Sequence, residues 1–567
     1  MPSSPESAAR PLWADPQAEP ADRVAALIEA MTLREKAAQL YGMWLGADPE
    51  GPGVAPHQSE LEKGFDLDAL LTQGLGQLTR AFGTNPVDPA AGAAALARMQ
   101  RRIVESGRFG IPALVHEECL AGFTTWKATA YPVPLSWGAT FDPELVREMA
   151  QRIGASMRSV GVHQGLAPVL DVVRDLRWGR VEETIGEDPY LVGTVATAYV
   201  QGLESAGIVA TLKHFAGYSA SRAGRNLAPV SMGPREFADV ILPPFEMAVA
   251  EGGVRSVMHS YAEVDGIPAA ANRELLTGLL RDTWGFTGTV VADYFGIGFL
   301  KLLHGVADTW GDAARLALEA GVDVELPGPK AFLDPLIEEI EAGRLDDTVV
   351  DRALTRVLLQ KLELGLLDPD WDARPAALTE ADLEPGADIA GTVDLDPAED
   401  RAVARRIAEE AVVLLKNDGT LPLTAPTCPS VSTSRPCSSR SARSSRTRTC
   451  GRRRAAPSTG RTPTASPPRS PRRGTRTSPW WCSATAPVSS AAARRARAAT
   501  PPTCPCRGCR ETCSRRCSTP ARRSCSSSTP DAPTRSARPP TARPRSCRPS
   551  SPAKKAAGRS PACSRAP

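Results

Sequence analysis

Between residues 75 and 365, short apolar segments alternate with segments of helical periodicity, and this alternation limits the fold more than any other feature. Strand-like segments lie at 111–118, 166–172, 208–215, 254–261, 288–294 and 322–328, and helical ones at 143–161, 190–206, 235–251, 273–283 and 312–321. Repeated strand–helix units build parallel sheets, because a parallel strand needs a crossover before the next one. About 300 residues of such units suffice for a TIM-like (β/α)8 barrel, which we predict. A doubly wound α/β sheet is the alternative.

The segment "GTVVADYFGI" (288–297) places one carboxylate, Asp293, directly after a β-branched apolar run. Such a run is typical of a strand covered on both faces. The C-terminal tips of barrel strands are where this fold holds its reactive groups, so Asp293 is a candidate catalytic residue. The alternative is a helix N-cap, a position that Asp also favours.

Polar side chains gather at the expected C-terminal ends of five successive strands, and a barrel would bring them to one face. Each alone has an ordinary structural explanation, but five polar tips in succession favour a shared site. They are His116, Glu117 and Glu118; Asp171 and Arg174; Lys213 and His214; His259 and Tyr261; and Asp293.

The motifs give no support for a bound metal or cofactor. Adjacent residues on a strand point to opposite faces, which argues against a metal site at residues 116–118, and no HExxH is present. No GxGxxG follows a strand and there is no P-loop, so we expect no cofactor. The mixture of acids, bases and a tyrosine instead suits a ligand with many hydroxyl groups, such as a pyranose, because it supplies donors and acceptors together. Glycoside hydrolysis needs two carboxyl groups beside the scissile bond, and Asp293 would supply one.

Several longer segments resemble glycoside hydrolase family 3, in the family's order. They are "RDLRWGRVEETIGEDPYL" (174–191), "LKHFAGY" (212–218), "VMHSYAEVDGIP" (257–268), "GFTGTVVADYFGI" (285–297), "AGVDVELPG" (320–328) and "AVVLLKNDGTLPL" (411–423). The resemblance covers about residues 20–426, and "HEECLAG" (116–122) is similar to the β-xylosidase and β-glucosidase branch. It implies a TIM-like barrel followed by an α/β sandwich domain, and a retaining mechanism with an Asp nucleophile.

The resemblance also implies residue roles. Asp293 matches the nucleophile, in "ADY", where Ala292 replaces the usual serine, and Leu176 replaces a proline in the motif that Arg174 opens. The side chains that the resemblance implies for sugar binding are Glu118, Arg174, Lys213, His214, Tyr261 and, from "RAGRN", Arg225. In this family the acid/base glutamate usually comes from the second domain.

The amino-acid composition of the chain changes near residue 426. Of the 67 Lys and Arg residues, 31 lie at 427–567, against two of the 64 Asp and Glu residues, and 12 of the 13 cysteines lie there as well. Residues 1–426 are therefore acidic with one cysteine, Cys119, which is typical of a cytosolic protein. No apolar run is long enough to span a membrane, and the N-terminus lacks a signal-peptide pattern, so we expect a cytoplasmic location and no membrane partner.

Residues 427–567 are rich in Arg, Ser and Pro without a sustained apolar period, and we expect them to be disordered. A nucleic-acid arm and a cysteine-based metal module are two interpretations, but the arginines are spread evenly and "CPCRGC" (504–509) has no second CxxC pair. We favour a frameshift. Moved by one base, residues 481–500 can encode an apolar strand and a glycine-rich loop with one glutamate, whose codon would straddle Ala496 and Arg497.

The predicted organisation is a glycosidase barrel at 20–370, a linker at 371–400, the start of a second α/β domain at 401–426 with a helix and a short strand, and the tail. The predicted function is that of a retaining exo-acting β-glycosidase that releases terminal β-D-glucosyl or β-D-xylosyl residues from an oligosaccharide or β-glycoside. We expect it to be impaired by loss of the acid/base domain. A sugar-binding barrel without turnover is the alternative. We expect no nucleic-acid partner, and the sequence leaves the oligomeric state open.

Overall fold

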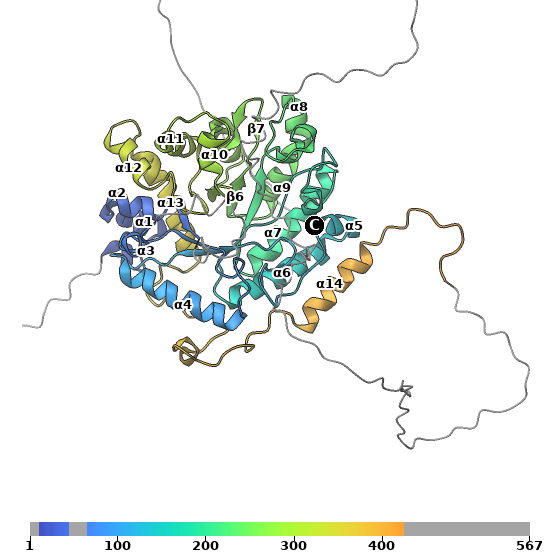
Figure 1. Cartoon of the computed structure of the whole chain (residues 1–567), viewed down its shortest axis with the longest axis horizontal. Coiled ribbons are helices and arrows are strands. Elements are labelled where there is room, and N and C mark those ends of the chain that lie inside the picture. The colour runs from blue at the N-terminus through green and yellow to red at the C-terminus, as the bar shows by residue number, and fades with distance from the viewer. Residues whose placement is uncertain (1–10, 45–64, 424–567) are drawn as a thin grey trace, which may run out of the picture. The chain divides into compact units, whose positions relative to one another are not determined.

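The computed structural model describes residues 11–44 and 65–423, which Figure 1 draws in colour. The tail predicted at 427–567 to be disordered or out of frame lies outside the described residues.

Parallel strands form one sheet in the order β1-β2-β3-β4-β5-β6-β9. Their bounds are β1 (Gly42–Met43), β2 (Gln77–Thr79), β3 (Leu114–Glu117), β4 (Gln164–Gly165), β5 (Val209–Phe215), β6 (Ser256–His259) and β9 (Thr289–Val291), while β7 (Glu263–Val264) and β8 (Ile267–Pro268) form a separate hairpin. An eighth segment joins the two edges, because Val324 forms a parallel bridge with Val291 and Glu325 forms one with Tyr41. The predicted TIM-like barrel is confirmed.

Helices alternate with these strands (Figure 1). The longer ones are α1 (Pro20–Ala30), α4 (Pro89–Ser106), α6 (Pro143–Ser159), α7 (Pro189–Ser205), α9 (Pro243–Glu251), α11 (Trp310–Ala320), α12 (Asp334–Glu341), α13 (Thr348–Glu363) and α14 (Ala398–Glu410). The shorter ones are α2 (Leu33–Ala38), α3 (Leu67–Leu71), α5 (Pro134–Thr140), α8 (Pro234–Glu236) and α10 (Gly296–Leu302). None of the helices in the described ranges is long and apolar enough to cross a membrane.

Three of the long helices begin with the same local signal, an Asp followed by a Pro. The carboxylates of Asp88, Asp142 and Asp188 each accept a hydrogen bond from a backbone N–H in the first turn of α4, α6 and α7. The proline after each Asp has no N–H to leave unpaired and already has a helical φ angle. The sequence therefore fixes where these helices start, and with them the lengths of the loops that leave the strands.

Some predicted elements are interrupted, and proline accounts for two of the interruptions. Residues 166–172 do not form a regular strand beyond β4 and add only the bridge between Val169 and Lys213, since Pro168 has no N–H for the ladder. The helix expected at 235–251 divides into α8, a π-helical turn at Phe237–Ile241 and α9, which begins at Pro243. The helix expected at 273–283 is a π-helix over Glu274–Thr283.

The helix predicted to start the second domain is present as α14, and it packs against α5 and α6 of the barrel. Ile407 is fully buried, and Asp400 pairs with Arg152 at 3.1 Å. The short strand predicted after it is not formed, because residues 411–423 contain no strand. Val412 and Leu415 are 77% and 93% exposed. A β-branched apolar run becomes a strand only when a neighbouring strand pairs with it and covers it, and the structure places no such strand beside it among the described residues.

Candidate active site

Asp293 lies two residues beyond β9, at the C-terminal end of the barrel, and is 9% exposed. The Tyr294 N–H donates to its Oδ1 at 2.8 Å, while Oδ2 accepts no hydrogen bond from any described residue. Burial raises the pKa of this carboxyl to about 6, and the positive charges of Arg180 and Lys213 oppose that rise. At neutral pH the group is therefore ionised, and its Oδ2 is a buried oxygen without a hydrogen-bond partner among the described residues.

Lys213 and Glu118 form an ion pair beside this carboxylate. Lys213 lies near the end of β5, and its Nζ is 2.9 Å from Glu118 Oε2, just beyond β3. Burial would raise the pKa of Glu118, but the charges of Lys213, Arg80 and Arg180 outweigh it, so that the pKa is lowered. Glu118 thus presents acceptors and Lys213 presents donors, both on strand ends that flank the same face.

Asp171 orients His214. Its carboxylate accepts hydrogen bonds from the His214 backbone N–H at 3.1 Å, from the His214 ring at Nδ1 at 2.8 Å, and from the Ser219 N–H at 3.3 Å. Burial, together with the charges of Arg180 and Lys213, holds the pKa of His214 well below its usual value, so the ring is neutral. With its proton on Nδ1, His214 leaves Nε2 as an acceptor, 3.8 Å from Asp293 Oδ2.

Tyr261 lies close to the nucleophile candidate. Its hydroxyl donates to the Tyr294 carbonyl at 2.6 Å, which fixes the backbone directly after Asp293. Burial and the charge of Asp293 raise the Tyr261 pKa well above its usual value, so the hydroxyl keeps its proton. Tyr294 in turn bonds through its own hydroxyl to His116 Nε2 at 3.2 Å.

Further polar side chains at the strand ends are buried and make hydrogen bonds within the barrel. His116 is fully buried, its Nδ1 lies 2.8 Å from Gln77 Oε1, and burial lowers its pKa to about 3. Glu117 is also fully buried, and its Oε1 accepts hydrogen bonds from the backbone N–H groups of Phe82 and Gly83. His259 is buried too, with Nδ1 3.0 Å from the Ser260 carbonyl oxygen. These side chains position strand ends and loops.

The structure does not bring Arg174 and Arg225 to this cluster. Arg174 extends to solvent, where it pairs with Glu236 at 3.2 Å. Arg225 is exposed as well, and its Nε donates to the Arg222 carbonyl at 3.4 Å. The loop that carries Arg174 leaves the barrel directly after the buried residues 171–173, so the first arginine of the motif faces outward.

The arginine that reaches the cluster is Arg180, which closes the same motif six residues later. It is 8% exposed, forms a two-point contact with Glu183 at 2.8 and 2.7 Å, and lies over the Tyr218 ring. Its charge acts on Asp293, Glu118 and His214, as their pKa shifts record. A sequence signal existed, because the motif contains three arginines, but spacing alone did not say which one turns inward.

Tyr218 and Arg80 are two further members that the sequence analysis missed. The Tyr218 ring is fully buried and packs edge-to-face on His214 and Tyr261, with centroids 5.2 and 5.8 Å apart. Arg80 follows β2 directly, is 4% exposed, and its charge acts on Glu118. The signal for Arg80 was its place after "QLT", which is too short to stand out as a strand.

The arrangement offers an ionised carboxylate surrounded by hydrogen-bond donors and acceptors. Lys213 and Arg180 are donors and Glu118 and His214 Nε2 are acceptors; Glu118 follows β3, Lys213 and His214 lie in β5, and Arg180 lies on the loop after residues 171–173. No group of three or more His, Cys, Asp or Glu side chains that could hold a metal ion occurs within residues 11–44 and 65–423. Fold and site together define a (β/α)8 barrel with a polar site at the C-terminal ends of its strands, the place where this fold holds reactive groups.

Comparison with known proteins identifies the family. The family described as "Glycosyl hydrolase family 3 N terminal domain" matches residues 32–359. The chain belongs to glycoside hydrolase family 3, as the motifs indicated.

Two relatives show how much of their length the chain matches. It is 35% identical to a β-xylosidase of Formosa agariphila over 351 residues, which are 58% of this chain and 46% of the relative. It is also 35% identical to a β-glucosidase of Rhizobium radiobacter over 298 residues, 52% of this chain and 32% of that one. The chain therefore spans about half or less of the relatives that it matches.

Solved structures are similar over the same part. A β-glucosidase from Erythrobacter marinus matches with a TM-score of 0.63 and 37% identity, over 72% of this chain and 52% of that one. A β-glucosidase from Listeria innocua matches with a TM-score of 0.61 and 30% identity, over 71% and 53%. That enzyme has also been solved with glucose bound.

Proposed function

We propose that the protein is a retaining, exo-acting β-glycosidase that acts on terminal non-reducing β-D-glucosyl or β-D-xylosyl residues. The observation that carries the proposal is Asp293, a buried ionised carboxylate with one oxygen free of hydrogen bonds in the described structure. A nucleophile needs such a free oxygen and must be ionised. Glu117 Oε2 also has no partner among the described residues, but burial raises the pKa of Glu117 to about 8, so at neutral pH that group keeps its proton while Asp293 does not. The names of the relatives, β-xylosidase and β-glucosidase, support the choice of sugars.

In this mechanism Asp293 Oδ2 attacks the anomeric carbon, and the aglycone leaves with the electrons of the glycosidic bond. The product is a covalent glycosyl ester, which water then hydrolyses. Lys213, Glu118 and His214 hold the sugar hydroxyls through the donors and acceptors derived above. Arg180 and Lys213 favour the ionised form of Asp293.

We also propose that the acid/base group lies outside the described residues. Glu118 pairs with Lys213, and Asp171, whose pKa burial raises to about 7, accepts hydrogen bonds from His214. Burial raises the pKa of Glu117 to about 8 and its Oε2 has no partner among the described residues, but this side chain is fully buried and its Oε1 accepts hydrogen bonds from backbone N–H groups. A general acid must be protonated and face the leaving group. A chain without such a group would be impaired, in line with the predicted frameshift. The second candidate is a sugar-binding barrel without turnover, which the same polar cluster would also serve.

A 2-fluoro glycoside with a dinitrophenolate leaving group is expected to label Asp293. The fluorine slows both steps and the leaving group restores the first, so the ester accumulates. Peptide mapping by mass spectrometry should find the sugar on the segment that contains residues 288–297, and the Asp293→Asn variant should stay unlabelled. Protection of the barrel by sugar without any labelling would favour the binding-only alternative. Labelling at another residue would disprove the assignment.

The first chemical step should follow the ionisation of Asp293. Its pKa is about 6, so the single-turnover rate of dinitrophenolate release should be constant above that pH and fall about tenfold per pH unit below it. Arg180 lowers this pKa, so Arg180→Gln should move the acid limb to higher pH. Arg174→Gln is the matched control and should leave the limb in place. A larger shift from Arg174→Gln than from Arg180→Gln would contradict the geometry.

A further inference from the structure

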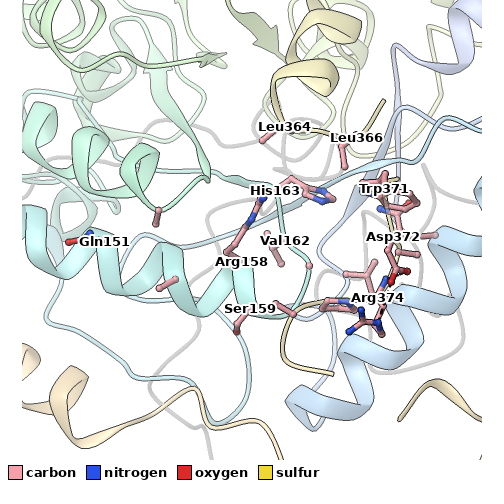
Figure 2. A pocket seen from close by; sticks show the side chains of 18 residues that line it. Gln151, Arg158, Ser159, Val162, His163, Leu364, Leu366, Trp371, Asp372 and Arg374 are labelled. Atoms are coloured by element: carbon pink, nitrogen blue, oxygen red, sulfur yellow. Dashed lines mark hydrogen bonds and ion pairs between the residues drawn. The ribbon is translucent and has the colours of Figure 1, made fainter. Parts of the chain in front are cut away.

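We infer that the protein has a second ligand site, at the N-terminal end of the barrel, which binds a small aromatic carboxylate. A cavity of about 550 Å³ lies there, between the end of α6, residues 161–163 and residues 371–376 (Figure 2). A cavity of this size accommodates a small organic molecule.

The site lies at the other end of the barrel from Asp293. His163 immediately precedes β4, while Leu114 and Val209 are the first residues of β3 and β5. Leu114 and Val209 pack with Leu364, Leu366 and Trp371 in a small apolar cluster of their own. Asp293 follows the C-terminal end of β9, so occupation of one site does not require the other.

The buried polar group of the cavity is His163, which is 8% exposed. The Val115 N–H donates to its Nδ1 at 3.0 Å, so Nδ1 carries a lone pair and the ring proton is on Nε2. Burial and the positive charges of Arg158 and Lys361 lower its pKa to about 3, and the ring stays neutral. Among the described residues no partner is recorded for Nε2, and Figure 2 shows the ring extending into the pocket toward Trp371. His163 therefore offers one N–H donor to whatever enters.

Arg158 supplies the charge. Within the described ranges it makes no ion pair with a carboxylate, and its recorded hydrogen bond is a long one, 3.4 Å from Nη1 to the Gly207 carbonyl. The other charged side chains of the wall satisfy each other, because Arg374 pairs with Asp372 at 3.2 Å. Gln100 is satisfied as well, since its amide bonds to both the N–H and the carbonyl of Ala113. The available groups are thus a guanidinium and an N–H, both of which can donate hydrogen bonds to carboxylate oxygens.

The rest of the lining selects the body of the ligand. Leu364 and Leu366 are buried beneath the pocket, Val162 lies beside His163, and the indole of Trp371 forms the facing wall. An aromatic ring fits between apolar side chains and an indole face better than a hydrated sugar or a bare phosphate does. The acceptor group would then lie at His163 and Arg158, and the ring against Trp371.

Such a ligand would join two parts of the chain. Arg158 and Ser159 belong to the last turn of α6, whereas Trp371 and Arg374 belong to the segment between α13 and α14. A bound carboxylate would hold that segment against the barrel and would stabilise the folded state through its binding free energy.

The test is isothermal titration calorimetry on the full chain with 2-naphthoate as the probe. We expect saturable binding of one molecule per chain and an upward shift of Tm. The neutral isostere 2-naphthamide, acetate and inorganic phosphate should each bind at least about tenfold more weakly. Arg158→Gln should weaken naphthoate binding at least about tenfold, because it removes the charge. Trp371→Leu should weaken it as well.

Arg147→Gln is the matched control, since Arg147 lies on the same helix but pairs with Glu144 away from the cavity. This variant should bind as the unchanged protein does. His163→Phe removes the N–H donor and should also weaken naphthoate binding. Because His163 is buried, the Tm of this variant without ligand is compared with that of the unchanged protein first. Arg158 is exposed, so the Arg158→Gln variant decides the question on its own. Equal affinity for naphthoate and naphthamide, binding that Arg158→Gln leaves unchanged, or competition by glucose would each overturn the inference.

Discussion

Replacement of Asp293 by alanine is expected to lower the rate of dinitrophenyl glycoside cleavage by at least about 10⁴-fold, because the reaction loses the atom that forms the covalent bond. The side chain accepts one backbone hydrogen bond, from Tyr294, so the fold should survive the change. The measurement is phenolate release at neutral pH, with circular dichroism and Tm as checks on folding.

Azide, an external nucleophile, provides a second test of the role of Asp293. In the alanine variant the lost carboxylate leaves room on the face from which Asp293 attacks, so azide should restore turnover and give an α-glycosyl azide from a β-glycoside. Asp282→Ala, at an exposed position shortly before β9, is the control and should keep the full rate. An Asp293→Ala variant that retains a tenth of the rate without azide would remove Asp293 from the mechanism.

The barrel could be predicted because its signals are local and repeated. Most of the apolar runs between residues 75 and 330 become buried strands, and the Asp-Pro pairs at Asp88, Asp142 and Asp188 start helices. In the sequence, Pro168 and Pro243 indicate that a strand and a helix are interrupted there. How many residues each interruption includes depends on which backbone N–H and C=O groups the neighbouring elements can pair with. The strand expected after α14 fails for the same reason, since a strand is defined by its neighbour as much as by its own residues.

The site was predictable where a side chain lies on a strand tip and uncertain where it lies on a loop. Asp293, Lys213 and Glu118 follow strands whose direction fixes where they point, and the structure brings them together. Arg174 and Arg180 lie on one loop, and only its path decides that the second turns inward beside Tyr218 while the first meets Glu236. Arg174 and Arg180 are the first and last residues of the same motif, and nothing in the sequence says which of them faces the site. Only the three-dimensional path of the loop shows that it is Arg180.

The chain as it stands is expected to release a stoichiometric burst of phenolate from a dinitrophenyl glycoside and then to turn over slowly. An activated phenolate leaves without a proton, so Asp293 alone completes the first step. The second step needs a base to activate water, and Glu118, Asp171 and Glu117 are held by Lys213, His214 and the backbone. Rapid-mixing absorbance should give a burst amplitude close to the enzyme concentration. Alkyl glycosides and disaccharides should react hardly at all, because their leaving groups require a general acid, which in our proposal this chain lacks.

Azide distinguishes this deficiency from the loss of the nucleophile. It needs no base, so it should accelerate the slow phase of the unchanged chain and trap the ester as a β-glycosyl azide, the opposite anomer from the one expected with Asp293→Ala. The two products therefore report separately on Asp293 and on the acid/base group that our proposal places outside the described residues. Disaccharide hydrolysis at tens of turnovers per second in order of magnitude would mean that another residue serves as the acid. In that case one of the three carboxyl groups, Glu118, Asp171 or Glu117, must release its hydrogen-bond partner when the sugar binds. Glu118 would be the first to examine, because its side chain is partly exposed and its partner Lys213 also faces the ligand.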